Sequence, residues 1–265
     1  MERTRVYTIG SIKQGFSGNP TVCFYSSMIT RKHLLPVLLL ISVSVQSAET
    51  SGDWAANVQI PKGENFTRLF DGQTLSGWEG QKQYWSVHDG AIRGTNDKAI
   101  STSSYLFTKN NYRNFRLLLE VKQTRGPQFS DMHSAIAALG EKMEDKGDPF
   151  SFKGPLLMFC NDWGIWDANR RNRVYPPKHP GQYHPPVERT GEWNRIEVLV
   201  IGDRVRMVAN GKMVIDFTDK PGMLKESPIG LQLHSNNRPQ EYHFRGLMVS
   251  ENPRDELVTL AKTEP

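Results

Sequence analysis

The distribution of apolar residues into short runs between turns most constrains the fold of this chain. After residue 48, no window of helix length shows apolar residues at the helical spacing of 3.6. Residues 84–94, YWSVHDGAIRG, read as two strands around an Asp-Gly turn. Residues 193–218 read as three strands, with Gly-containing turns at 202–203 and 210–211. Strands rather than helices are therefore predicted throughout the domain.

About a dozen short strands with closely spaced turns indicate a β-sandwich or barrel. Three longer segments do not fit this strand pattern and are predicted to be loops, which in a compact all-β domain usually carry function. The tail after residue 253 could form one helical turn. The further strands are expected at residues 115–122, 133–139, 155–160, 228–235 and 241–250, and the loops at 123–132, 140–154 and 161–190.

The N-terminal part has the features of an export signal. Residues 34–45 form an apolar run of twelve, preceded by Arg31 and Lys32 and followed by the small residues Ser47 and Ala48. The run is shorter than the roughly 20 apolar residues that a membrane span needs, so no stable span is expected after processing. We predict an N-terminal extension at 1–27, a signal peptide at 28–48, a linker at 49–64, a domain at 65–253 and a tail at 254–265. The expected location is periplasmic or extracellular.

Charge and cysteine content change once the leader is set aside. Residues 1–48 hold five basic residues and one acidic residue, so they supply +4 of the formal net charge of +5 and leave +1. Such a balance gives no support for a nucleic-acid partner. Cys160 is then the single cysteine of the domain, so no intrachain disulfide is expected there. Its place in the apolar run LLMFC predicts a buried, inert thiol.

The stretch LFDGQTLSGWEG (69–80) resembles the start of the 3-keto-disaccharide hydrolase domain family, formerly a domain of unknown function. Similar segments follow in order at 84–94, 112–122, 191–219 and 228–236, and the resemblance covers about residues 66–251. It implies an all-β, concanavalin A-like jelly-roll β-sandwich of two antiparallel sheets with long loops. From the residues themselves, Asp71-Gly72 predicts a tight turn, and Leu75 and Trp78 are expected in the core.

The resemblance also implies an activity, the cleavage of 3-keto-glycosides. A ketone at C3 makes the C2 hydrogen acidic, so a base can remove it, the C1 substituent leaves, and water adds to the enone. This chemistry needs one base and one donor for the enolate oxygen. One departure stands against it: many members read Glu-x-Gln on the strand after Gly-Pro, where this chain has Leu156 and Met158. Either other groups act here or the activity has been lost.

Strand alternation selects the candidate catalytic residues. In GLQLHS, Leu231 and Leu233 share one face, so Gln232 and His234 share the opposite one. In FRLLLEVK, Glu120 faces away from Leu119 and its apolar neighbours. If the leucines fill the core, these polar side chains, with Glu197, come to one surface. We predict His234 and Glu120 as catalytic residues, while for Glu197 a structural ion pair is the favoured interpretation.

The segment 161–186 is dense in aromatic and charged residues, a combination that suits sugars because rings stack on C–H faces while Arg and Asp bond hydroxyls. The alternative is a proline-stiffened loop that packs its own aromatics. No zinc spacing or calcium-loop pattern is present, so no catalytic metal and no cofactor are expected, although a structural calcium stays open. The predicted substrate-binding residues are Asp162, Trp163, Trp166, Asp167, Arg170 and Gln232.

Three functions fit these observations. The first is an exported hydrolase or lyase of glycoside hydrolase type, acting on an oligosaccharide or 3-keto-glycoside. The second is a non-catalytic, lectin-like carbohydrate-binding module that uses the same face. The third is a structural or interaction domain of the cell envelope. The first is favoured, and it would be marked by a cleft in which His234 lies within hydrogen-bond reach of a carboxylate. A lectin would instead show an open groove lined by Trp163, Trp166 and Tyr175 without such a pair, and an interaction domain a flat apolar patch. The oligomeric state is open.

Overall fold

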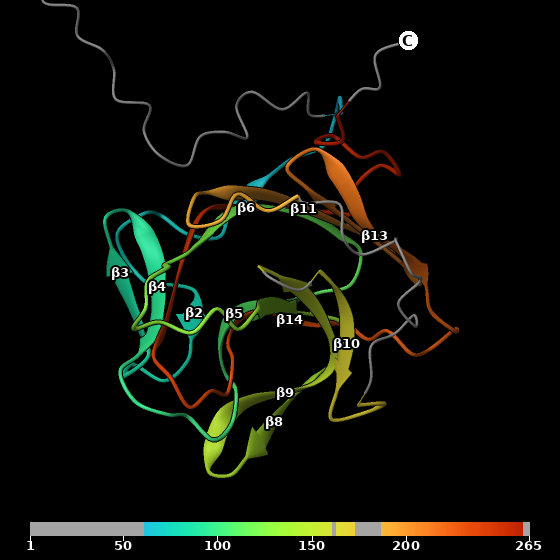
Figure 1. Cartoon of the computed structure of the whole chain (residues 1–265). Coiled ribbons are helices and arrows are strands. Elements are labelled where there is room, and N and C mark those ends of the chain that lie inside the picture. The colour runs from blue at the N-terminus through green and yellow to red at the C-terminus, as the bar shows by residue number, and fades with distance from the viewer. Residues whose placement is uncertain (1–60, 161–162, 173–186, 262–265) are drawn as a thin grey trace, which may run out of the picture. The chain divides into compact units, whose positions relative to one another are not determined.

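The computed structural model describes residues 61–160, 163–172 and 187–261 (Figure 1). The chain divides into two units, Met1–Val45 and Gln46–Pro265, and all described residues belong to the second. The predicted extension at 1–27, the signal peptide at 28–48 and most of the linker lie outside the described residues. Within the described part there are fifteen strands and no helix, and the strands form two antiparallel sheets. The predicted all-β class and its two antiparallel sheets are confirmed.

The larger sheet contains eight strands, with the predicted three-strand segment at one edge and the predicted hairpin at the other. A short strand, β1 (Thr67–Arg68), joins it by pairing with β15. The order of the remaining strands is β13 (Lys212–Thr218), β12 (Arg204–Ala209), β11 (Asn194–Ile201), β6 (Phe115–Gln123), β15 (Gln240–Glu251), β4 (Ala91–Asn96) and β3 (Trp85–His88).

The smaller sheet contains seven strands and carries the cavity described below. An additional hairpin extends from it, because β8 (Glu141–Asp145) pairs with the first half of β9. The order of the other strands is β10 (Gly164–Ala168), β9 (Asp148–Phe159), β7 (Ser134–Ala137), β14 (Ser227–Leu233), β5 (Ser104–Tyr112) and β2 (Trp78–Glu79).

The main core lies between the two sheets, which Figure 1 shows as layers, with β6 and β11 in one and β5 and β14 in the other. Alternation places Leu117 and Leu119 of β6 and Leu231 and Leu233 of β14 in this core, as the sequence predicts. Each sheet also has an outer face, the one turned away from the core. On the outer face of the smaller sheet, Tyr105 and other side chains form a second apolar cluster.

The opening motif folds as predicted. The carboxylate of Asp71 accepts hydrogen bonds from the backbone N–H groups of Gln73 and Thr74, both at 2.7 Å, and Gly72 adopts a φ of 83°. Trp78 is buried, and its indole N–H donates to the carbonyl of Leu69 at 2.7 Å. The turn thus fixes the chain where it enters the sandwich.

Several expectations about local structure are wrong. Residues 140–154 form the β8–β9 hairpin rather than a loop, residues 164–168 form β10 inside a predicted loop, and β5 at 104–112 was not predicted. β8 is polar and mostly exposed, so it lacks the apolar alternation by which a strand is recognised. The tail from 254 to 261 contains no helical turn. It is held by Glu197, whose carboxylate accepts the backbone N–H groups of Val258 and Thr259 at 3.0 and 2.8 Å.

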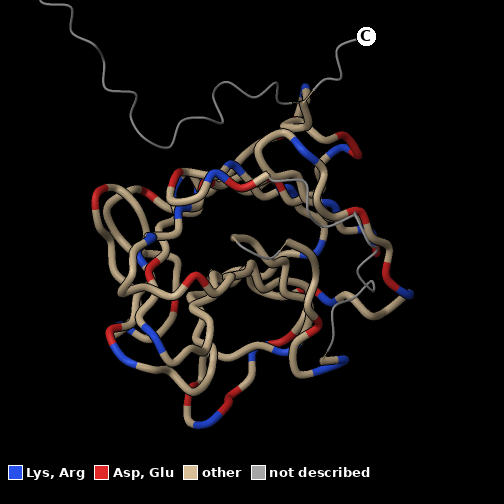
Figure 2. Tube along the Cα trace, viewed as in Figure 1, with Lys and Arg blue, Asp and Glu red and all other residues tan. Residues whose placement is uncertain are grey.

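The structure also shows the environment of Cys160 and the distribution of charged residues. Cys160 is buried, as expected, and burial raises the pKa of its thiol well above the usual value. Charged residues of both signs are interspersed along the described strands and loops (Figure 2). The described residues include no helix long and apolar enough to span a membrane.

Candidate functional site

A cavity of about 510 Å³ lies on the outer face of the smaller sheet. Its volume falls within the range of roughly 300–1,000 Å³ that is usual for small-molecule sites. Strands β5 and β14 supply its base, β9 and β10 supply an apolar wall, and the β8–β9 turn closes one side. Its polar and aromatic lining includes Tyr105, His133, Asp145, Trp166, Gln232 and His234.

Strand β14 positions two of the predicted site residues. Leu231 and Leu233 are buried in the core between the sheets, so Gln232 points to the outer face and into the cavity. His234 follows the last residue of β14 and also lines the cavity. The parity argument from the sequence is therefore confirmed for this strand, whereas no carboxylate among the described residues forms a hydrogen bond or ion pair with His234.

A hydrogen bond sets the tautomer of the neutral His234 ring. Its Nδ1 lies 2.7 Å from the backbone carbonyl oxygen of Ser235. Because a carbonyl can only accept, Nδ1 carries the hydrogen, and Nε2 is the basic nitrogen of the neutral ring. Burial lowers the pKa of His234, and the hydrogen bond to Ser235 opposes this effect in part. The imidazole is therefore disposed to remain neutral and to accept a proton at Nε2.

A hydrogen-bonded pair forms the base of the cavity. The amide Nε2 of Gln232 donates to the hydroxyl of Tyr105 at 3.0 Å and lies 3.3 Å from the hydroxyl of Ser103. The Oε1 of Gln232 is buried and has no hydrogen-bond partner among the described residues. Burial also raises the pKa of Tyr105 strongly, so its hydroxyl keeps its proton. The base of the cavity thus contains a protonated hydroxyl and a buried acceptor that has no partner among the described residues.

The opposite wall of the cavity is apolar. Leu156 and Met158 of β9 are almost fully buried, and Trp166 of β10 is half-buried beside them. The strand on which polar residues were expected from the resemblance therefore faces the cavity, and in this chain it places aliphatic side chains there. Two contacts tie the adjoining hairpin in place, since the hydroxyl of Thr102 donates to Asp145 and the ammonium of Lys146 donates to the carbonyl of Ser101 at 3.1 Å.

Glu120 does not share this site, so the prediction of one common surface with His234 is wrong. Strand β6 belongs to the larger sheet, and Glu120 points to the outer face of that sheet. Its carboxylate accepts from Arg245 at 2.6 Å and Arg195 at 3.2 Å. The guanidinium carbon of Arg245 also lies 3.9 Å from the centroid of the Trp193 ring, on which it stacks. Alternation gave the correct face of each strand but could not give the sheet.

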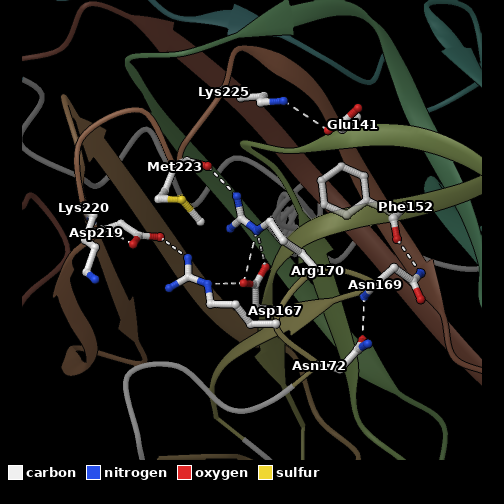
Figure 3. Close-up of polar contacts among 11 residues, drawn as sticks. Glu141, Phe152, Asp167, Asn169, Arg170, Asn172, Asp219, Lys220, Met223 and Lys225 are labelled. Atoms are coloured by element: carbon white, nitrogen blue, oxygen red, sulfur yellow. Dashed lines mark hydrogen bonds and ion pairs between the residues drawn. The ribbon is translucent and has the colours of Figure 1, made fainter.

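Three predicted sugar-binding residues serve the fold instead. Trp163 is buried in the core between the sheets. Asp167 is buried and accepts from the guanidinium groups of Arg170, at 2.8 Å, and of Arg171. Figure 3 shows Asp167 paired with Arg170, which also reaches the carbonyl of Met223. The ion pairs of Asp167 close the end of β10. None of Trp163, Asp167 and Arg170 lines the cavity.

The other predicted substrate-binding residues lie partly inside and partly outside the described residues. Trp166 and Gln232 line the cavity, whereas Asp162 and most of the aromatic segment 161–186 lie outside the described residues. No group of three or more His, Cys, Asp or Glu side chains within 61–160, 163–172 and 187–261 is placed to hold a metal ion. The structural calcium stays a prediction.

Sequence reasoning missed three chemically important lining residues, Tyr105, His133 and Asp145. Tyr105 lies on β5, a strand that was not predicted, and Asp145 lies in a segment taken as a loop. For His133 a signal existed, since it is the first residue of the predicted strand HSAIAAL and immediately precedes β7, but alternation along β7 alone does not show that its neighbour would be His234.

Comparison with known proteins identifies the family. Residues 65–250 match the 3-keto-alpha-glucoside-1,2-lyase-like domain. The chain belongs to this family. The matched region includes both sheets and the cavity, because it extends from β1 to nearly the end of β15. A comparison with curated proteins found no match.

Solved structures similar to this 3-keto-alpha-glucoside-1,2-lyase-like domain confirm the concanavalin A-like fold. A candidate glycosyl hydrolase from Parabacteroides distasonis is 20% identical with a TM-score of 0.50, covering 71% of this chain and 94% of that one. The exoplasmic/lumenal domain of VIP36 bound to Ca²⁺ and mannose is 10% identical with a TM-score of 0.51, covering 71% and 90%. The Emp47p carbohydrate recognition domain is 11% identical with a TM-score of 0.50, covering 71% and 95%. At these identities the likeness concerns the fold alone.

Proposed function

We propose that the protein binds a saccharide in the cavity of the smaller sheet and cleaves 3-keto-glycosides there. The observation that carries the proposal is a neutral imidazole, that of His234, in a cavity whose base presents hydrogen-bonding groups from Gln232 and Tyr105. Family membership supports the substrate class. Trp166 in the opposite wall supports it as well, because an indole ring suits the C–H face of a sugar.

In the proposed reaction, Nε2 of His234 removes the hydrogen from C2 of the sugar. The electrons of that C–H bond form the enolate with the C3 ketone, and the amide of Gln232 or the hydroxyl of Tyr105 donates to the enolate oxygen. The enolate then re-forms the ketone as the C1–O bond breaks, leaving an enone and expelling the C1 substituent as an alkoxide, which takes up a proton to become the alcohol. Water adds to C1 of the enone in the second stage. The ketone of the substrate is itself the electron sink, so the step requires no cofactor.

Export is part of the proposal, because a substrate made or released outside the cytoplasm would need an exported enzyme. It rests on the basic, apolar and small-residue pattern of residues 28–48. Fractionation of cells expressing the full chain tests it. Recovery of the protein from the periplasm or medium, with its N-terminus near residue 49, is the expected result, and retention of the uncleaved chain in the cytoplasm would contradict it.

A non-catalytic carbohydrate-binding module is the second candidate, and the aliphatic wall of Leu156 and Met158 favours it. The matching folds include the carbohydrate recognition domain of Emp47p. Incubation of the purified protein with 3-keto-trehalose and 3-keto-cellobiose separates the two functions. The enzyme releases free glucose from at least one of them, whereas a binding module only shifts the resonances of Trp166 and Gln232. His234→Gln should abolish release while saccharide binding is retained, and full turnover by this variant would refute His234 as the base.

A further inference from the structure

A second imidazole lies against His234 in the cavity. The rings of His133 and His234 are 4.8 Å apart between centroids, with an interplanar angle of 79°. His133 precedes β7 and His234 follows β14, and these two strands pair in the smaller sheet. Because paired strands hold their ends side by side, the two rings meet at the same edge of the cavity, which both of them line.

Side chains from the larger sheet hold the backbone next to both rings. The hydroxyl of Tyr242 donates to the carbonyl of Met132, the residue before His133, and the amide of Gln123 donates to the same carbonyl at 2.9 Å. The amide of Gln240 donates to the carbonyl of His234 itself. Side chains of β6 and β15 therefore extend through the interior and hold the segments that carry His133 and His234 in fixed positions relative to one another. Such fixed geometry is what a catalytic pair needs.

Two imidazoles at this distance cannot both carry a proton easily. A positive charge on one ring at about 5 Å disfavours protonation of the other by about two pKa units at an effective dielectric constant of about 20. Repulsion of this size lets the pair hold a single proton over a broad pH range below the ordinary imidazole value near 6.5. Burial disfavours the charged form of His234, which makes it the neutral member of such a pair.

We propose that His133 is the general acid of the reaction and works with His234 as a pair that holds one proton. The inference rests on the proposed function and adds a second catalytic residue to it. Neutral His234 takes the C2 proton, and protonated His133 gives its proton to the glycosidic oxygen as the C1–O bond breaks. The pair begins and ends the elimination with one proton. In the hydration, His133 accepts a proton from the attacking water, and His234 returns one to C2.

The other ionisable groups that line the cavity come from two further elements. Tyr105 on β5 stays protonated, because burial raises its pKa strongly. Asp145 and Lys146 come from the β8–β9 turn, where each is already bound to the 101–102 segment. They bring opposite charges to the rim of the cavity, beside the contact between the two imidazole rings.

The role of His133 as the acid is tested by how kcat depends on the leaving group of the substrate. Wild type, His133→Gln and His234→Gln are compared on a 3-keto-glucoside with a methanol leaving group and on one with 4-nitrophenol. We expect His133→Gln to lose about 100-fold or more in kcat on the methyl glycoside and less than about 5-fold on the nitrophenyl glycoside, whose phenolate leaves without a proton. His234→Gln should lose both activities. Equal losses for His133→Gln on both substrates, or none on either, would overturn the role of His133.

Imidazole NMR titration of the protein without ligand gives a test that does not need turnover. With His133→Gln, the pKa of His234 should rise by about one or more, because the neighbouring charge is gone. The exposed His88→Gln is the matched control and should leave the titration of His234 unchanged. An identical titration of His234 in wild type and His133→Gln would refute the pair. If wild type cleaves neither glycoside while the titration shows coupling, the proposed function fails and the proton-sharing pair stands.

Discussion

The amide Nε2 of Gln232 lies 3.0 Å from the hydroxyl oxygen of Tyr105 at the base of the cavity. Both side chains are almost fully buried, and they come from the neighbouring strands β14 and β5, where the two residues are register partners. The contact sets the direction of the amide and leaves Oε1 of Gln232 without a partner. A buried acceptor of this kind is where a saccharide hydroxyl would bind.

Removing the hydroxyl of Tyr105 should therefore weaken both the fold and the site. We expect Tyr105→Phe to cost about 1–2 kcal/mol in unfolding free energy, because the buried amide of Gln232 loses a partner. Saccharide affinity should fall about 10-fold. Urea denaturation and calorimetric titration with the 3-keto-glycoside measure the two effects. Unchanged affinity would mean that the orientation of Gln232 does not matter for binding.

Trp166 should contribute to affinity rather than to stability, because it is half-buried in the cavity wall on the short edge strand β10. Trp166→Ala should lower saccharide affinity by about 10- to 100-fold, consistent with the loss of a stacking aromatic. Trp193→Ala, on the larger sheet under Arg245, is the matched control and should bind as wild type does. Equal affinity in both variants would place the saccharide elsewhere.

Stability should decrease on acidification in a way that depends on His234. Its pKa is lowered by burial, so between its ordinary value near 6.5 and its folded value the unfolded chain binds more protons than the folded one. Stability is therefore lost as pH falls through this window. Urea denaturation from pH 8 to pH 5 should show a smaller pH-dependent loss for His234→Gln than for wild type. His243 has a lowered pKa too, so part of the loss should persist in the variant.

The pair Arg116–Glu197 should be far more important for stability than a surface pair. Both side chains are fully buried, Glu64 also accepts from Arg116 at 2.7 Å, and the carboxylate of Glu197 holds the tail through Thr259. Glu197→Ala should destabilise the fold by about 3–5 kcal/mol, because it leaves the guanidinium buried without that partner.

The matched control for this prediction is Asp216→Ala, which breaks the exposed pair with Arg204 and should cost less than about 1 kcal/mol. Hydrogen exchange of the amides of Val258 and Thr259 should accelerate in Glu197→Ala and stay unchanged in the control. Similar stabilities for the two variants would show that the buried pair does not anchor the tail.

The sequence by itself determined where most strands run and which way their side chains point. The alternation in GLQLHS placed Leu231 and Leu233 in the core and Gln232 opposite, and the alternation in FRLLLEVK did the same for Leu119 and Glu120. Turn chemistry at Asp71-Gly72 and Asp89-Gly90 was equally readable, because the positive φ angles of these turns select such residues locally.

Only the tertiary structure decided which polar faces meet. Alternation is a local property with a period of two, so it specifies a face for each strand but not the sheet that the strand joins. Sheet membership depends on pairings between segments far apart in sequence, such as β14 with β5 and β6 with β15. Those pairings set Glu120 against Arg245 on one outer face and His234 against His133 on the other.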